Sequence, residues 1–467
     1  ARIPPMWFSK VPPLSRSRAL STSFRRFSST SFDLNGIAYG LPAANRPAVA
    51  ICLDGSSQDY IDAATQAGCM PNWNSILTRS KNRGQHALCC CVVPSFTNPN
   101  NVSIVTGSLP KVHGITGNYF FDESTEAEVS MNDPKFLWSE TVLAKLSEQG
   151  VSVTVLTAKD KLLRMLASGL DKDNSLAMSI EFAANEESKT TLAARGTSLM
   201  DLMGTETPPP IYSADISIFL LEMGLRLVQR EQASQSFYYL STTDYVQHKH
   251  APGSPEANDF YRRVDAVVGG LDAAGAAVAL TADHGMNDKT RFDGSPRVVY
   301  AGDVLALAGI AARVVLPITD PYVAHHGALG SYGTVYLKDK SQLARAMALL
   351  RQQPGFYTVM NNEDACRAFD LPSSRVGDIV ILGDQSTVVG RSEDHHDLSQ
   401  VNHLRSHGGL EEQVVPIFLN RPLTSKYAKA MGRGKLRNFH MFELLLNGID
   451  ETDSVGVKLP GRNLDSC

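Results

Sequence analysis

Seven side chains scattered along the sequence are of the types that could hold two metal ions. They are Asp54, Thr97, Asp244, His248, Asp283, His284 and His407. Asp244 and His248 stand four residues apart in DYVQH, which places both on one face if this turn is helical. Imidazole and carboxylate ligands without a thiolate favour zinc over manganese or iron. Two such ions could clamp the attacking and leaving groups of an in-line displacement at phosphorus.

Thr97 is the candidate nucleophile of this set. It stands in SFTNPNN, directly before a run of residues that we expect to be helical. A hydroxyl at the start of a helix lies beside backbone N–H groups and the positive end of the helix dipole, which suits a bound phosphate-like anion. The alternative is that Thr97 is only an N-cap residue, a common role for threonine.

Each of the other motifs also has a simpler interpretation. A DxxxH pair on a helix is often a surface pair, an Asp-His dipeptide alone indicates little, and a histidine in a glycine-rich loop is usually solvated. What favours a metal centre is that the candidates follow the ends of different predicted strands.

Five short apolar runs predict buried strands, and each is followed by a candidate side chain. The runs are 48–53, 86–93, 151–156, 237–240 and 276–280. The side chains that follow them are, in the same order, Asp54, Thr97, Lys159, Asp244 and Asp283. Helical patterns between these runs predict an α/β fold, a parallel-rich sheet between two helix layers. In such sheets ligands bind beyond the carboxyl ends of the strands.

The remaining segments complete this outline. Helices are predicted at 59–67, 98–106, 138–149, 213–232 and 260–273, and helix and loop at 171–207. The alternation weakens after residue 286. We predict a catalytic core formed by residues 34–299 and 381–467, into which residues 300–380 are inserted as a small α+β cap.

The first 33 residues differ in composition from the rest. They contain five arginines, one lysine and many serines, with no acidic residue before Asp33. This profile is typical of a mitochondrial transit peptide, and a disordered tail on a cytoplasmic protein is the alternative. The net charge of −4 does not favour a nucleic-acid partner, and no apolar run approaches the roughly 20 residues that span a bilayer.

Six motifs in order along the chain resemble those of the alkaline phosphatase superfamily. They are LDG at 53–55, SFTNPNN at 95–101, TGSLPKVHGITGN at 106–118, DYVQH at 244–248, ADHGM at 282–286 and RSHGG at 405–409. The set is similar to the branch that holds the nucleotide pyrophosphatase/phosphodiesterases and the phosphonoacetate hydrolases. The resemblance covers essentially everything after residue 34.

This resemblance implies two zinc ions per subunit and a role for each candidate side chain. Asp54, Thr97, Asp283 and His284 would hold the zinc that activates Thr97. Asp244, His248 and His407 would hold the second zinc. Asn118 and the backbone N–H of Thr97 would bind a phosphoryl oxygen. The family also suggests a homodimer.

Within this branch the sequence looks most like the phosphonoacetate hydrolases, because Lys159 and Lys161 in TAKDK match the two lysines that bind the substrate carboxylate there. The implied reaction is zinc-dependent hydrolysis of the carbon–phosphorus bond of phosphonoacetate to acetate and phosphate, through a phosphothreonine. The alternative is a nucleotide pyrophosphatase/phosphodiesterase on the same two-zinc site. A binding protein without activity would be expected to lack a ligand. A metal-independent esterase would be expected to carry a G-x-S-x-G motif, which is absent.

Overall fold

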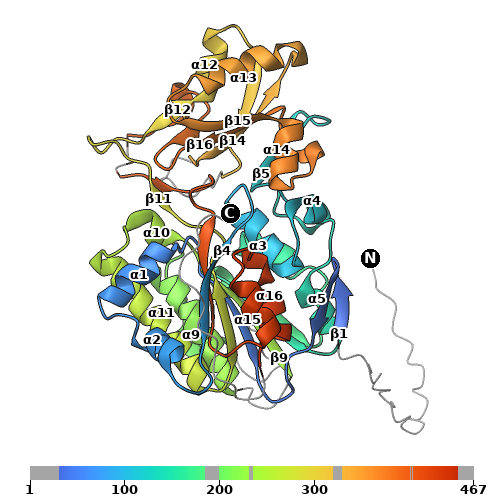
Figure 1. The fold of residues 1–467 in the computed structure, drawn as a ribbon, viewed down its shortest axis with the longest axis vertical. Helices are drawn as coiled ribbons and strands as arrows, with labels where there is room; N and C mark the ends of the chain where they lie inside the picture. Colours follow the sequence, from blue (N-terminus) through green and yellow to red (C-terminus); the bar gives the residue numbers. More distant parts are fainter. Residues whose placement is uncertain are drawn as a thin grey trace, which may run out of the picture.

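A seven-stranded sheet forms the centre of the molecule (Figure 1). The computed structural model describes residues 31–184, 199–230, 235–318, 329–399, 401 and 403–450. The strand order across the sheet is β4-β19-β10-β3-β9-β7-β8. The bounds are β3 Ala48–Cys52, β4 Gln85–Cys90, β7 Ser152–Thr157, β8 Ser175–Ser179, β9 Ser236–Ser241, β10 Ala277–Thr281 and β19 Val414–Leu419.

The direction of the strands brings their carboxyl ends together. β10, β3, β9, β7 and β8 pair in parallel. β19 pairs antiparallel with both β10 and β4, so β4 runs in the same direction as the parallel strands. The predicted parallel-rich sheet is therefore confirmed, and the segments that follow β3, β4, β7, β9 and β10 leave it at one edge.

Helices cover both faces of this sheet, because the central strands are apolar on both sides. In β3, Ala48, Ala50 and Cys52 pack into one buried cluster, whereas Val49 and Ile51 pack into the other. The first face is covered by α3 Thr97–Thr106, α5 Val142–Glu148, α6 Asp160–Leu166, α15 Ser425–Met431 and α16 Met441–Glu443. The second is covered by α1 Gln58–Gln66, α2 Pro71–Thr78, α8 Leu199–Met203, α9 Ala214–Arg230 and α11 Pro255–Ala273.

One strand of the main sheet lies where no strand was predicted. The segment 171–207 was expected to be helix and loop, but it contributes the edge strand β8, which pairs with β7. Its sequence SLAMS contains no β-branched or aromatic residue, so pairing with the neighbouring strand decides its conformation. The helix predicted at 138–149 is also shorter, since Thr141 caps α5 by accepting from the N–H of Ala144 at 3.0 Å.

A smaller antiparallel sheet lies above the core in Figure 1. Its strands are β13 Ala312–Val315, β14 Tyr332–Leu337, β15 Phe356–Asn361 and β16 Ile379–Gly383, with helices α12 Ala301–Leu307, α13 Leu343–Arg351 and α14 Asn362–Phe369. We call this region the cap. β12 Val298–Tyr300 pairs with β17 Val388–Gly390 at its base, on either side of the predicted limits. The division at residues 300 and 380 stays a prediction.

Short elements near the sheet edge were also not predicted. They are the hairpins β1 Ser31–Leu34 with β2 Ile37–Gly40 and β5 Tyr119–Asp122 with β6 Ala127–Ser130, the pair β11 Asn287–Asp288 with β18 Arg405–Ser406, and the helices α4 Pro110–His113 and α10 Tyr245–Lys249.

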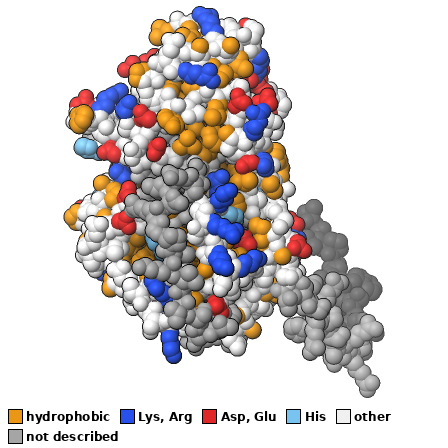
Figure 2. Space-filling model, in the orientation of Figure 1, with side chains coloured by type: hydrophobic (Ala, Val, Ile, Leu, Met, Phe, Trp, Pro, Cys, Tyr) orange, Lys and Arg blue, Asp and Glu red, His pale blue; other side chains and the backbone are white. Residues whose placement is uncertain are grey.

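Three observations bear on the predicted partners and location of the protein. Residues 1–30, which contain most of the predicted transit peptide, lie outside the described residues. Among the helices that the structure describes, none is long and apolar enough to cross a membrane. Acidic and basic side chains are interspersed over the cap on the face shown in Figure 2, in keeping with a net charge near zero.

Candidate active site

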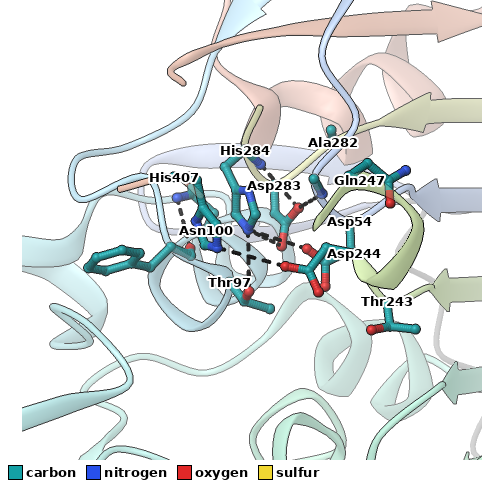
Figure 3. A network of polar contacts seen from close by, with 12 residues as sticks. Asp54, Thr97, Asn100, Thr243, Asp244, Gln247, Ala282, Asp283, His284 and His407 are labelled. Atoms are coloured by element: carbon teal, nitrogen blue, oxygen red, sulfur yellow. Dashed lines mark hydrogen bonds and ion pairs between the residues drawn. The ribbon is translucent and has the colours of Figure 1, made fainter. Parts of the chain in front are cut away.

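A cavity of about 100 Å³ lies at the carboxyl edge of the main sheet. The structure places eight of the predicted site residues in its wall, which are Asp54, Thr97, Asn118, Lys159, Lys161, Asp244, His248 and His407. Asp283 and His284 lie behind this wall and are completely buried. The close view in Figure 3 shows the carboxylates and histidines converging on one point beside Thr97.

Thr97 is the first residue of α3, and the N-cap position belongs to Phe96. The alternative that Thr97 is only an N-cap is therefore wrong. Its hydroxyl oxygen lies 3.3 Å from Nε2 of His284 (Figure 3). The turn before it is held by Asn100, whose amide accepts from the N–H of Val92 at 2.7 Å and donates to the carbonyl of Phe96 at 3.0 Å. This turn presents the hydroxyl to the histidine and carboxylate cluster.

Three carboxylates share this small buried space, and their electrostatics are unfavourable without cations. Burial raises the pKa of Asp54 well above its usual value, and the charges of Asp244 and Asp283 raise it further. Burial likewise raises the pKa of Asp283. Burial opposes ionisation of Asp244 too, but His248, together with other nearby positive groups, outweighs this effect and holds the pKa of Asp244 well below its usual value. Negative charge is thus concentrated where a cation would relieve it.

The three histidines are oriented as metal ligands usually are. Nδ1 of His248 lies 2.7 Å from the carbonyl of Arg405, Nδ1 of His407 lies 2.8 Å from that of Ser95, and Nδ1 of His284 lies 3.0 Å from that of Gly285. A carbonyl can only accept, so in the neutral ring Nδ1 carries the proton and the Nε2 lone pair faces the cluster. Such outer hydrogen bonds are typical of histidines that bind metals.

Two groups of ligand atoms are compact enough to hold a metal ion. One consists of Asp54, Asp283 and His284, as the resemblance implied, and the other consists of Asp244, His284 and His407. The second group shares Asp244 and His407 with the expected set and also contains His284, whereas His248 lies beside it. The rings of His284 and His407 stack at 3.6 Å, whereas Nε2 of His248 lies 2.9 Å from Asp244 Oδ2. His248 is therefore in direct contact with the carboxylate of the second group, and its assignment to the second ion stays a prediction.

The loop that carries His407 is fixed by close packing and a buried ion pair. Gly408 has a φ of 116° and lies against Phe96, where a Cβ atom would come within 2.4 Å of the ring. The N–H of Gly409 donates to Glu412 at 2.9 Å, and the other carboxylate oxygen of Glu412 lies 2.8 Å from Lys289 Nζ. Both charged side chains are completely buried. A side chain at position 408 would clash with the Phe96 ring and strain the loop that carries His407.

Another part of the cavity wall carries the two lysines. Lys159 stands at the N-cap position of α6, directly after β7, and Lys161 lies in its first turn. Nζ of Lys159 lies 5.9 Å from the ring centroid of Tyr212. The structure thus brings both predicted lysines to the same cavity as Thr97.

Further residues that were not predicted also line the cavity, among them Tyr119, Asn132, Tyr212 and Ile318. Tyr119 directly follows Asn118 and could have been found as part of that motif. Asn132 accepts from the side chain of Asn98 at 2.9 Å, a contact between residues 34 positions apart. Tyr212 and Ile318 stand in loops without any motif, so only the fold reveals them.

A family model agrees with this site. The model for type I phosphodiesterase / nucleotide pyrophosphatase matches residues 48–410. An uncharacterized pyrophosphatase/phosphodiesterase of Schizosaccharomyces pombe is 23% identical over 281 residues, which are 58% of this chain and 50% of that protein. The chain therefore spans about half the length of this curated relative.

Solved structures show the same relationship at higher similarity. Phosphonoacetate hydrolase from Sinorhizobium meliloti 1021, in complexes with phosphonoformate and with phosphonoacetate, is 44% identical, with 89% of this chain and 98% of that chain covered and a TM-score of 0.79. Murine ectonucleotide pyrophosphatase / phosphodiesterase 5, in an inactive form with AMP, is 16% identical. The match covers 88% of this chain and 97% of that chain, with a TM-score of 0.56, and shows a similarity of fold alone. The chain therefore belongs to the type I phosphodiesterase/nucleotide pyrophosphatase family of enzymes.

Proposed function

We propose that this enzyme hydrolyses the carbon–phosphorus bond of phosphonoacetate to acetate and phosphate. The observation that carries the proposal is that Lys159 and Lys161 share one small cavity with Thr97 and with both groups of metal-binding side chains. A substrate with a phosphonate at one end and a carboxylate at the other matches this arrangement. The 44% identity to a hydrolase solved with phosphonoacetate supports the same substrate class.

The side chains present fit two zinc ions. Three buried carboxylates and three histidines converge, and Oδ1 of Asp54 is buried without a hydrogen bond. Asp54, Thr97, Asp283 and His284 would hold one ion, and Asp244, His248 and His407 the other. When bound, the ions would neutralise the phosphonate charge and lower the pKa of the Thr97 hydroxyl. Seven oxygen and nitrogen donors without a thiolate fit zinc in open sites.

The protein's own groups would then perform the displacement. Thr97 Oγ1 attacks phosphorus in line, the carbon–phosphorus bond breaks, and its electron pair spreads onto the substrate carboxylate as an ene-diolate. Lys159 and Lys161 face this growing negative charge, so they stabilise the transition state more than the bound substrate. The proton that the Thr97 hydroxyl gives up passes through solvent to the ene-diolate carbon and converts it to acetate. One water then hydrolyses the phosphothreonine, its oxygen going to phosphate and a proton returning to Thr97.

The size of the cavity favours a small substrate over a nucleotide. Its volume of about 100 Å³ lies below the roughly 300–1,000 Å³ of pockets for drug-sized ligands. The side chain of Asn118 lies where it could bind a phosphoryl oxygen, since its carbonyl oxygen is 3.4 Å from the N–H of Asn98 and its amide nitrogen can donate to a substrate.

Phosphate release from phosphonoacetate by the zinc-loaded protein tests this proposal, beside a nucleotide diester and an aryl phosphodiester. We expect release from phosphonoacetate that a chelator abolishes and added zinc restores. Activity on the diesters alone would indicate that the enzyme is a nucleotide pyrophosphatase/phosphodiesterase. The lysines would then not have the proposed role. The homodimer and the mitochondrial location remain predictions, for sedimentation and for import into isolated mitochondria.

A further inference from the structure

A buried asparagine behind the ligand cluster has no role in the proposed reaction. Asn101 lies on α3, four residues after Thr97, and is completely buried. Its Nδ2 donates to Asp283 Oδ2 at 2.9 Å and to the carbonyl of Thr97 at 3.2 Å. Its Oδ1 accepts from the hydroxyls of Tyr239 at 2.8 Å and Ser241 at 3.1 Å. One amide therefore contacts both the nucleophile's backbone and a proposed metal ligand.

The chemistry of the partners leaves one orientation for this amide. The Asp283 carboxylate can only accept when ionised, so it must face the Nδ2 group of Asn101. The two hydroxyls then donate to Oδ1, which uses both of its lone pairs. Tyr239 and Ser241 lie on β9, the strand that leads to Asp244. The orientation of the Asn101 amide is thus fixed by two hydroxyl donors on the main sheet.

The second oxygen of Asp283 is held independently. Oδ1 accepts from the N–H of Gly55 at 3.2 Å and from that of His284 at 3.0 Å. With Asn101 on Oδ2, three donors fix the plane of a carboxylate that has no exposed surface. Oδ2 keeps one lone pair, and it lies 3.7 Å from His284 Nε2. Oδ2 of Asp283 is therefore held in a fixed orientation before any metal binds.

We infer that Asn101 is a positioning residue, which aims Asp283 at the metal and is itself aligned by Tyr239. The inference rests on the proposed function, because it requires that Asp283 binds metal. Outer hydrogen bonds of this kind typically change metal affinity by about 10- to 100-fold. Asn101 would act by restricting the carboxylate, without touching substrate.

The chain contains a matched control at the opposite edge of the sheet. Asn420, at the end of β19, is also completely buried. Its Nδ2 donates to Asp272 Oδ1 at 2.8 Å and to the carbonyl of Ala276 at 2.9 Å, and its Oδ1 accepts from the N–H of Val278 at 2.7 Å. The Nδ2 groups of Asn101 and Asn420 thus each donate to one carboxylate and one backbone carbonyl, and only the carboxylate held by Asn101 belongs to the ligand cluster.

The test is zinc affinity of the full chain, measured by competition with a chromophoric chelator, together with the melting temperature of the metal-free protein. We expect Asn101→Ala and Asn420→Ala both to lower the melting temperature. Only Asn101→Ala should lose zinc affinity, by about 10- to 100-fold. Equal affinities for the two variants would overturn the inference alone. A wild-type protein that binds no zinc would overturn the proposed metal centre as well.

A double-mutant cycle keeps the inference testable if Asn101→Ala folds poorly. Tyr239→Phe removes one donor to Asn101 and should weaken zinc binding severalfold in the otherwise wild-type chain. In the Asn101→Ala background the same change should add nothing, within about twofold. A full, additive loss in both backgrounds, or no loss from Tyr239→Phe alone, would overturn the coupling through Asn101.

Discussion

The two walls of the cavity are built differently. The wall formed by the carboxylates and histidines is almost fully buried, and the polar atoms of Asp283 and the three histidines are held by backbone groups or by Asn101. The wall formed by Lys159, Lys161 and Tyr212 is partly open, with Tyr212 37% exposed. The first wall is organised before substrate arrives. The second wall is more exposed to solvent.

This difference assigns different tasks to the two walls. Charges in contact with water are screened and bind weakly by themselves. Under the proposed function, the lysines would therefore gain their effect only when a substrate carboxylate excludes water from them. In the proposed reaction the buried wall acts on the phosphorus atom of the substrate. We therefore expect damage to the buried wall to affect all substrates, and damage to the lysine wall to affect only those with a carboxylate.

The largest effect is expected for Thr97→Ala. Loss of the nucleophile should lower turnover of phosphonoacetate and of an aryl phosphate ester alike, by about 10⁴-fold or more. Zinc should remain bound through the other ligands, which metal analysis of the purified variant would establish. Thr106→Ala, at the far end of the same helix, is the control and should retain activity. Loss of activity on only one of the two substrates would contradict the proposal that the buried wall acts on all substrates.

Lys161→Ala should show the opposite pattern. Cleavage of phosphonoacetate should fall by about 10²- to 10³-fold, because the ene-diolate loses a cation. An activated aryl phosphate ester, whose leaving group bears no carboxylate, should be cleaved at nearly the wild-type rate. Lys172→Ala, an exposed lysine beyond α6, is the control. Equal losses on both substrates would contradict the proposed role of the lysine wall.

Asp54→Asn separates stability from metal binding on the buried wall. Burial and two neighbouring carboxylates disfavour the charge of Asp54, so a neutral side chain should raise the melting temperature of the metal-free protein. Zinc at about 100 times its Kd should stabilise the wild type by about 2.7 kcal/mol, and the variant by less. Thermal melts with zinc and with a chelator measure both changes. A variant that melts lower without metal would contradict the electrostatic argument.

The smallest effect concerns the support beneath α3. His113, at the end of α4, is completely buried, and its Nε2 lies 2.8 Å from the hydroxyl of Ser103 on α3. Burial and the charge of Arg375 lower the pKa of His113 to about 3. Because the folded pKa lies below the unfolded value of 6.5, its contribution to stability is present above pH 6.5 and is lost as pH falls toward 3.

Between pH 7 and pH 5 this single residue should lower the free energy of unfolding by about 2 kcal/mol. Denaturant unfolding at the two pH values measures the change. His113→Gln, which cannot be protonated, should show a flatter pH dependence. If both proteins lose stability equally, groups other than His113 cause the acid sensitivity. The pH dependence would then not come from the contact of His113 with α3.

Much of the fold and of the candidate site was predictable from sequence. Apolar runs such as 48–53 and 276–280 are continuous because β3 and β10 are covered on both faces, so they indicate a parallel sheet between helices. Parallel strands place their carboxyl ends at one edge, which is why residues as distant as Asp54 and Asp283 could be expected to meet. The cysteine-free set of ligand types indicated the class of metal.

Other properties were decided by the tertiary structure alone. The conformation of β8 depends on its partner strand, and the acceptors of the histidine Nδ1 atoms are backbone carbonyls, which every residue carries. The position of His284 between both ligand groups and the hydrogen bonds of Asn101 likewise depend on distances between chain segments far apart in sequence. Residue types and their spacing determined the chemistry available to this protein. Only packing determined which atoms face one another, because hydrogen bonds and ligand geometry depend on distances of a few tenths of an ångström that no sequence pattern encodes.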